Sequence, residues 1–223
     1  MDVTREIEAL RPALSLAETE ESWDTISAAI TKISTMVQDG ACDNPRDFVP
    51  AIRSCVAPLN SAMKSERTRL SGTAIECINS IAAGLGASFD PLIQLFFPTL
   101  LLLCARTNKV VVTRARNAIF VIIDNTQLPS LLHYLQSSIS DKSASMRLAS
   151  AEAALKCLNC FNPADIEREA RAIDVEIIIR TSAKDANADI RKVSRKLFEA
   201  YKILVPGRVA RCVPHNNVLE VVI

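Results

Sequence analysis

The feature that most constrains this chain is a short polar loop with basic residues that recurs between apolar helical stretches. The loops are centred near Trp23, Ser65, Asn108, Lys142 and Ala186, so the intervals between them are 42, 43, 34 and 44 residues. Periods of this length are typical of HEAT and armadillo repeats, in which each repeat is a pair of antiparallel helices. The sequence therefore predicts an all-α fold, an α-solenoid of about five HEAT-like helical hairpins.

The composition agrees with stacked helices. Hydrophobic residues make up 49% of the 223 residues, but only 4% are aromatic, so Leu, Ile, Val and Ala must build the core. Five Gly and ten Pro are too few for an all-β protein with many tight turns. A chain of this length can bury a sizeable core as one domain or as a continuous array.

We expect a single repeat domain over residues 1–206 and a C-terminal tail of uncertain structure over residues 207–223. The five helix pairs are expected at residues 2–38, 46–86, 89–125, 128–161 and 163–205.

Local signals predict several helix boundaries. Ser22 is expected to cap one helix, and residues 46–63 are expected to form one continuous helix. Asp90 is expected as a cap with Pro91 in the first helical position, and the fourth and fifth pairs are expected to begin in the same way, at Pro129 and at Pro163. Residues 110–123 start with β-branched side chains, which favour a strand, but the repeat predicts a helix there.

The longest apolar run, residues 91–105, is shorter than the ~20 residues that a membrane span needs. We therefore expect a buried central helix and no membrane partner. The N-terminus is charged and does not resemble a signal peptide. The seven cysteines are an odd number without regular spacing, which indicates a reduced, cytoplasmic compartment.

Charge is distributed unevenly along the chain. The net charge is +1, which does not favour nucleic acid as a partner, but residues 1–63 carry five Lys or Arg against ten Asp or Glu. The remaining residues carry 21 against 15, so positive charge gathers in the later repeats. Because the pairs are antiparallel hairpins, all loops within pairs should lie along one edge. The sequence thus predicts a basic ridge, although solvated loops ordinarily carry Lys and Arg.

No arrangement typical of an enzyme, a metal site or a cofactor site is present in the sequence. Cys157 and Cys160 have metal-ligand spacing, but they lie within a helix without a second pair, so both are expected to face a core. His133 and His215 have no partner at catalytic spacing, and His133 is expected to be half-exposed. Gly84 and Gly86 end a helix and do not form a phosphate-binding loop.

Several segments resemble the second TOG domain of the CLASP family of microtubule regulators. The similarity extends over about residues 47–211 and depends on the order and spacing of its parts. These are Phe89-Asp90-Pro91-Leu92, Asn108-Lys109-Val110, Asn125-Thr126-Gln127-Leu128-Pro129, Lys142-Ser143 with Arg147, and Asp185-Ala186-Asn187-Ala188-Asp189 followed by Arg191, Arg195 and Lys196.

The resemblance implies a tubulin-binding module that uses the loops within helix pairs, with an aromatic residue in the first loop and basic residues in the later ones. It assigns Trp23 as the aromatic contact, although a lone Trp is usually core. The candidate basic contacts are Lys64, Arg67, Lys109, Lys142, Arg147, Lys184, Arg191 and Lys192.

The function implied by the resemblance is regulation of microtubule dynamics, in the spindle or the interphase array, by a monomeric domain bound to αβ-tubulin in the cytoplasm and cytoskeleton. The alternative is a generic armadillo or HEAT scaffold that binds a protein partner or an extended peptide. Such scaffolds typically carry ladders of Asn and Trp, and this chain has a single Trp.

Overall fold

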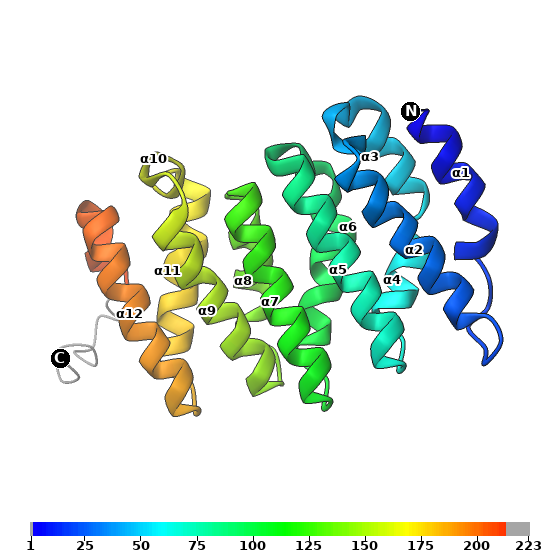
Figure 1. Ribbon diagram of the computed structural model, residues 1–223. Helices are drawn as coiled ribbons and strands as arrows, with labels where there is room; N and C mark the ends of the chain where they lie inside the picture. The colour runs from blue at the N-terminus through cyan, green and yellow to red at the C-terminus, as the bar shows by residue number, and fades with distance from the viewer. Residues whose placement is uncertain (1, 213–223) are drawn as a thin grey trace. The chain divides into compact units, whose positions relative to one another are not determined.

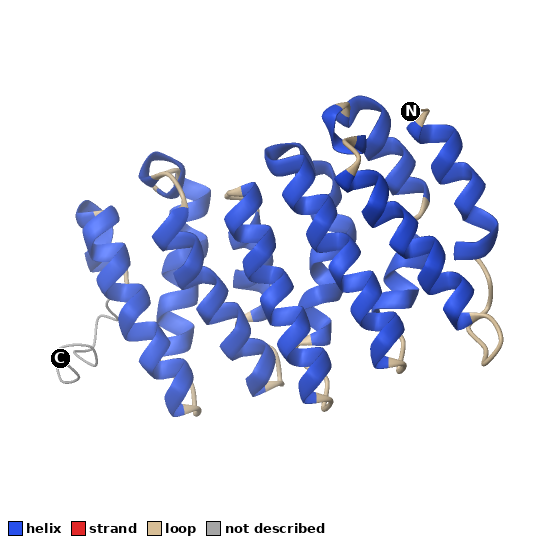
Figure 2. Cartoon of the chain, in the orientation of Figure 1, coloured by secondary structure: helices blue, strands red, loops and turns tan. Residues whose placement is uncertain are grey.

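The computed structural model describes residues 2–212, and all regular structure within this range is helical (Figures 1 and 2). The chain divides into two compact units, unit 1 up to Thr126 and unit 2 from Gln127 onward. Each unit consists of antiparallel helix pairs packed side by side. The prediction of an all-α fold built from helical hairpins is confirmed.

Unit 1 contains three helix pairs in two layers. One layer holds α2 (Trp23–Gln38), α5 (Thr68–Leu85) and α7 (Lys109–Thr126), with α5 in contact with both neighbours. The other layer holds α1 (Val3–Leu14), α3 (Pro45–Ser54), α4 (Val56–Met63) and α6 (Asp90–Leu103). Short 3₁₀ helices at Ala41–Asp43 and Gly86–Phe89 (η1 and η2) connect successive pairs.

Unit 2 contains two helix pairs in the same arrangement. Helices α9 (Ala144–Cys160) and α12 (Ala188–Leu204) pack side by side, and α8 (Leu131–Ser138) packs against α11 (Glu169–Ala183). The short helix α10 (Pro163–Ile166) leads into α11. Residues 206–211 form a 3₁₀ helix (η3), and the part of the expected tail from 213 to 223 lies outside the described residues.

The core is mainly aliphatic, as the composition predicts, and also contains Phe side chains. Phe48, Phe89, Phe96 and Phe97 are fully buried. Several buried serines donate their hydroxyl hydrogens to main-chain carbonyls, as Ser71 does to Met63 (2.8 Å), which satisfies the buried donor. The stretch Thr68–Leu103 is apolar and long enough to cross a membrane, but it comprises two helices separated by η2, and half of its most apolar window is buried.

Helix α7 begins at Lys109, so its β-branched first turn is helical as the repeat predicts. The expected continuous helix over residues 46–63 is wrong, because α3 ends at Ser54 and α4 starts at Val56. Pro58 has no N–H for the carbonyl of Ser54. A new helix that starts at Val56 places Pro58 in the first turn, where the missing donor costs nothing.

Two expected helix starts also need correction, and a third helix starts as expected but is short. Phe89, not Asp90, occupies the cap position of α6. Pro129 lies in a tight turn before α8, two residues after Gln127, which has a φ of +49°. Asn162 caps α10, which starts at Pro163 as expected. However, α10 ends after four residues, and α11 starts only at Glu169.

The 3₁₀ helix η3 is fixed to the last helix pair by a partly buried ion-pair cluster. Arg208 donates from Nε to Glu176 Oε1 (2.8 Å), and the Tyr201 hydroxyl donates to the same oxygen (3.0 Å). Arg208 also contacts Glu169, which Arg211 contacts at 3.1 Å. Because Glu176 is buried, these partners provide the compensation that a buried carboxylate needs.

Candidate functional site

The loops within helix pairs lie at one end of each unit (Figure 2). We call them pair loops. In unit 1 they are residues 15–22, 64–67 and 104–108, and in unit 2 they are residues 139–143 and 184–187. Each connects two antiparallel helices that pack together, so its ends are fixed by the helix packing.

Trp23 is the first residue of α2 and is half-buried, as its position at a helix start suggests. The guanidinium carbons of Arg67 and Arg69 lie 5.8 and 5.6 Å from the centre of its ring, within the range of cation–π attraction. An open hollow of about 560 Å³ lies beside the ring and is lined by Trp23, Asp24, Ser27, Ala28, Thr31 and Arg69. The indole thus lies beside two cations at the edge of a hollow.

Ser22 occupies the cap position of α2, as expected, but its side chain bonds within the first pair loop. Its hydroxyl donates to the carbonyl of Ala17 (2.6 Å) and accepts from the N–H of Thr19 (2.9 Å). No hydrogen bond joins its side chain to α2, so the expected cap contact is wrong. The loop itself offers these closer partners, which a local sequence signal cannot reveal.

Arginines connect the pair loops of unit 1 to one another. Arg67 contacts Glu20 (2.7 Å) and Glu18 (3.4 Å), and the Ser65 hydroxyl donates to Glu18 (2.7 Å). Arg106 in the third pair loop contacts Glu66 in the second.

The second guanidinium nitrogen of Arg106, Nη2, donates to the carbonyl of Lys64 (2.7 Å). Arg106 was not among the predicted residues, because its position does not match the basic position of the other loops.

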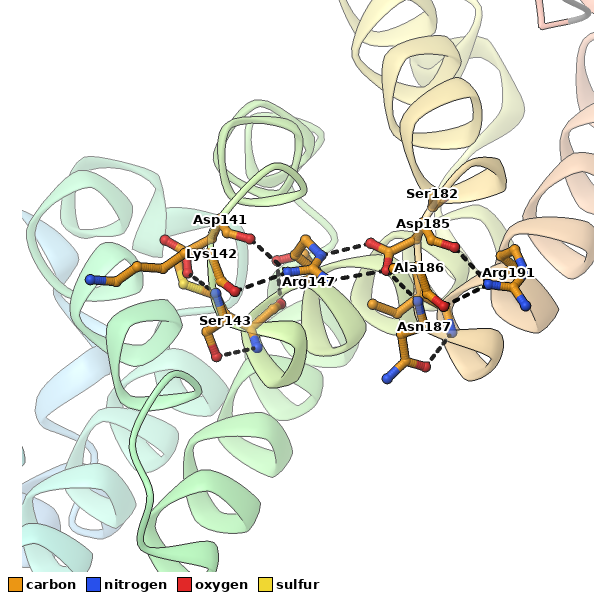
Figure 3. A network of polar contacts seen from close by, with 12 residues as sticks. Asp141, Lys142, Ser143, Arg147, Ser182, Asp185, Ala186, Asn187 and Arg191 are labelled. Carbon is orange, nitrogen blue, oxygen red and sulfur yellow. Dashed lines mark hydrogen bonds and ion pairs between the residues drawn. The ribbon is translucent and has the colours of Figure 1, made fainter.

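The two pair loops of unit 2 share a motif in which Asp is followed two residues later by Ser or Asn and six residues later by Arg (Figure 3). The Asp side chain accepts the N–H of the Ser or Asn, from Ser143 to Asp141 at 2.7 Å and from Asn187 to Asp185 at 2.8 Å. The Ser or Asn then caps the following helix.

The arginine of each motif closes its own loop. Arg147 donates from Nη1 to the carbonyls of Asp141 (2.9 Å) and Lys142 (3.1 Å). Arg191 donates in the same way to the carbonyls of Asp185 (2.7 Å) and Ala186 (2.8 Å). These two arginines satisfy loop carbonyls that have no partner within the helices.

Arg147 also joins the first motif to the second. Its Nε and Nη2 donate to the two carboxylate oxygens of Asp185, at 2.6 and 3.0 Å (Figure 3). The two side chains are only 17% and 6% exposed. Hydrogen bonding from Arg147 lowers the pKa of Asp185, and the N–H of Asn187 and the charge of Arg191 act in the same direction. This fork fixes the two pair loops of unit 2 against each other.

The structure separates the predicted basic residues into two groups. The side chains of Arg67, Arg147 and Arg191 bind other parts of the chain, and Lys192 pairs with Asp189 at 3.2 Å while remaining exposed. The other four are exposed and have no side-chain partner within residues 2–212. They are Lys64, Lys109, Lys142 and Lys184.

The cysteine and histidine side chains provide no reactive centre within the described residues. Burial raises the pKa of Cys77 to about 12 and that of Cys42 to about 11, so these thiols stay protonated. Cys157 is buried as expected, whereas Cys160 is partly exposed. His133 is exposed, with Nδ1 3.6 Å from Asp174. No group of three potential metal ligands occurs among residues 2–212.

The sequence of this chain matches the model of a known protein family. The model of the family described as CLASP N terminal matches residues 3–217. Protein peg1 of Schizosaccharomyces pombe is 26% identical over 197 residues, which are 85% of this chain and 13% of that protein. The chain thus spans a small part of this relative's length.

Solved structures agree on the fold. A chain from a structural study of microtubule plus-end tracking by XMAP215, CLIP-170 and EB1 superposes with a TM-score of 0.75 at 17% identity, covering 100% of this chain and 90% of that one. The TOG domain of C. elegans Zyg9 gives a TM-score of 0.70 at 14% identity and covers 96% of this chain and 78% of that one. The chain therefore has the fold of a TOG domain.

Proposed function

Because the chain belongs to the CLASP N-terminal family, we propose that it is an interaction module that binds αβ-tubulin through its pair loops and thereby regulates microtubule dynamics. We infer from this that it acts in the cytoplasm on the microtubule cytoskeleton, in the spindle or the interphase array. It is a binding module and not an enzyme in this proposal, and it acts as a monomeric domain that holds tubulin.

The observation that carries the proposal is that the basic residues of the pair loops have two different roles. Arginines fix the loops in shape, and exposed lysines that have no side-chain partner among residues 2–212 lie in or next to those loops. A loop that is already ordered loses little conformational entropy when it binds. Lysines at the same end of a unit add their fields, which attracts an acidic protein surface.

Trp23 supplies the apolar part of the proposed contact. Trp23 is half-buried and its ring lies beside Arg67 and Arg69, so part of the residue remains accessible while these contacts restrict its orientation. Large, oriented aromatic side chains frequently dominate protein interfaces. In this proposal the three arginines that bind the chain itself, Arg67, Arg147 and Arg191, support the contact by keeping the loops in place.

The test is co-migration with tubulin on gel filtration. We expect the double substitution Lys142→Glu with Lys184→Glu to weaken binding by about tenfold or more, because two exposed cations become like charges against an acidic partner. The thermal melt should not change, since neither side chain has a partner among residues 2–212.

The matched control is Lys32→Glu with Arg53→Glu, which reverses two exposed cations away from the pair loops. Its binding should equal that of the wild type. If both double variants weaken binding equally, the effect comes from net charge alone and not from the pair loops. If Lys142→Glu with Lys184→Glu leaves binding unchanged, the contact lies elsewhere.

A further inference from the structure

A second surface of unit 2 lies away from its pair loops, between α9 and α12. A shallow groove of about 400 Å³ follows these two packed helices. Its lining consists of Leu155 and Asn159 from α9, and Arg195, Lys196, Glu199 and Ala200 from α12. Arg195 is eight residues beyond Asn187, which is about 12 Å along a helix. The groove is therefore separate from the surface in the proposed function.

The positive charge in this groove is not neutralised by the helix that carries it. Helix α12 has five basic and two acidic residues. Both acidic residues are engaged by lysines at i,i+3 spacing, Asp189 by Lys192 (3.2 Å) and Glu199 by Lys202 (3.1 Å). Arg195 and Lys196 are exposed and have no side-chain partner in the described part of the chain. Two adjacent cations thus face solvent at one rim.

The rest of the groove is not suited to a polyanion such as a nucleic acid. Leu155 and Ala200 are half-buried, so they present apolar surface between the polar groups. Glu199 interrupts the basic lining and is paired with Lys202, so the groove offers two adjacent cations and no continuous basic row for a polyphosphate backbone. The exposed amide of Asn159 can both donate to and accept from a peptide backbone.

We propose that the groove between α9 and α12 docks an acidic protein segment in which an apolar side chain is flanked by carboxylates. The apolar side chain contacts Leu155 and Ala200, and the carboxylates pair with Arg195 and Lys196. Guanidinium groups bind carboxylates through two parallel hydrogen bonds, which would orient the segment along α12. This inference does not rest on tubulin binding, because it uses none of the pair-loop residues.

The probe is a synthetic decapeptide with one central leucine flanked on each side by glutamates, titrated into the ¹⁵N-labelled protein. We expect amide shifts to concentrate on Leu155, Asn159 and the turn of α12 around Lys196. The double substitution Arg195→Glu with Lys196→Glu should weaken binding by about tenfold or more. Lys184→Glu with Lys192→Glu makes the same charge change in unit 2 outside the groove lining and should weaken it much less.

Two further probes separate the chemistry of the ligand. A peptide with serine in place of leucine should bind several-fold more weakly, and a short DNA duplex or vesicles with anionic lipid should not compete. Equal binding of the serine peptide, stronger binding of the phosphate probes, or equal effects of the two double variants would overturn the proposal. The variant Arg195→Glu with Lys196→Glu should still co-migrate with tubulin, which would show that the groove and the pair loops act independently.

Discussion

The pair loops of unit 1 and of unit 2 are both held by arginines, but with carboxylates in different surroundings. In unit 1 the partners of Arg67 and Arg106 include Glu20 and Glu66, whose side chains are 78% and 86% exposed. In unit 2 the partner of Arg147 is Asp185, which is 6% exposed and also accepts a main-chain N–H. Similar loops are thus fixed by weak surface pairs in one unit and by a shielded fork in the other.

The difference shows how ion pairs contribute to a repeat fold. An exposed pair gains little, because water and salt screen it and two long side chains must be ordered. A shielded pair with further hydrogen bonds contributes more, and its loss leaves a charge without compensation. We therefore expect unit 2 to depend on its loop arginine far more than unit 1 does.

The largest effect should follow from Arg147→Ala. Removal of the guanidinium leaves the Asp185 carboxylate and two loop carbonyls without their partner. We expect the free energy of unfolding to fall by about 2–3 kcal/mol, measured by urea denaturation. Arg67→Ala is the matched change in unit 1 and should have a much smaller effect. Equal losses in the two variants would contradict the contrast between the units.

A second prediction concerns Trp23→Ala in unit 1. The ring is half-buried, so its loss should lower stability by about 1 kcal/mol, less than the ~3–5 kcal/mol of a fully buried aromatic side chain. Tubulin binding should weaken by about 2 kcal/mol, or roughly thirtyfold. Thermal melts and co-migration on gel filtration measure the two effects. A collapsed melt or intact co-migration would reject Trp23 as a binding anchor.

Acid should act on unit 2 through Asp185. Its pKa is lowered in the folded state, chiefly by the hydrogen bonds from Arg147, so it stabilises the fold above its unfolded pKa of about 3.9. This stabilisation is lost as the pH falls through the folded-state pKa. Urea midpoints between pH 6 and pH 2.5 should fall less steeply for Asp185→Asn than for the wild type. Parallel curves would show that Asp185 does not contribute.

The smallest effect should come from salt acting on unit 1. Glu20→Gln removes an exposed partner of Arg67, and we expect a small decrease in the melting temperature at low salt. The decrease should vanish in 1 M NaCl, where the Debye length falls from ~10 Å at 0.1 M to ~3 Å. The Arg147→Ala effect should persist at the same salt concentration. If the effect of Glu20→Gln does not depend on salt, the Arg67–Glu20 pair is shielded from solvent in the same way as the Arg147–Asp185 pair.

Much of the fold could be predicted from the repeat spacing. The helical start of α7 follows from it, because a repeat constrains a segment whose own propensity is ambiguous. The break before Pro58 was missed and the helix start at Pro129 was wrong, because a proline fits either a first helical turn or a preceding turn. Packing against neighbouring helices decides between these positions.

The candidate site was predictable to a lesser degree. The loop lysines and the half-exposed Trp23 could be located from sequence position alone. The roles of Arg106 and Arg147 could not be, because each depends on a carboxylate 38 to 40 residues away. The groove beside Arg195 and Lys196 was also missed, since it needs two helices from different pairs to lie side by side.

The sequence by itself determined that this chain forms helix pairs and that its pair loops carry basic residues, because helical periodicity and loop composition are local properties. Only the tertiary structure decided which cations are committed to the fold and which remain available to a partner. A guanidinium group binds whatever acceptor lies within about 3 Å, and the stacking of neighbouring repeats sets that distance. Asp185 and Arg147 therefore acquire their role only when two helix pairs pack together.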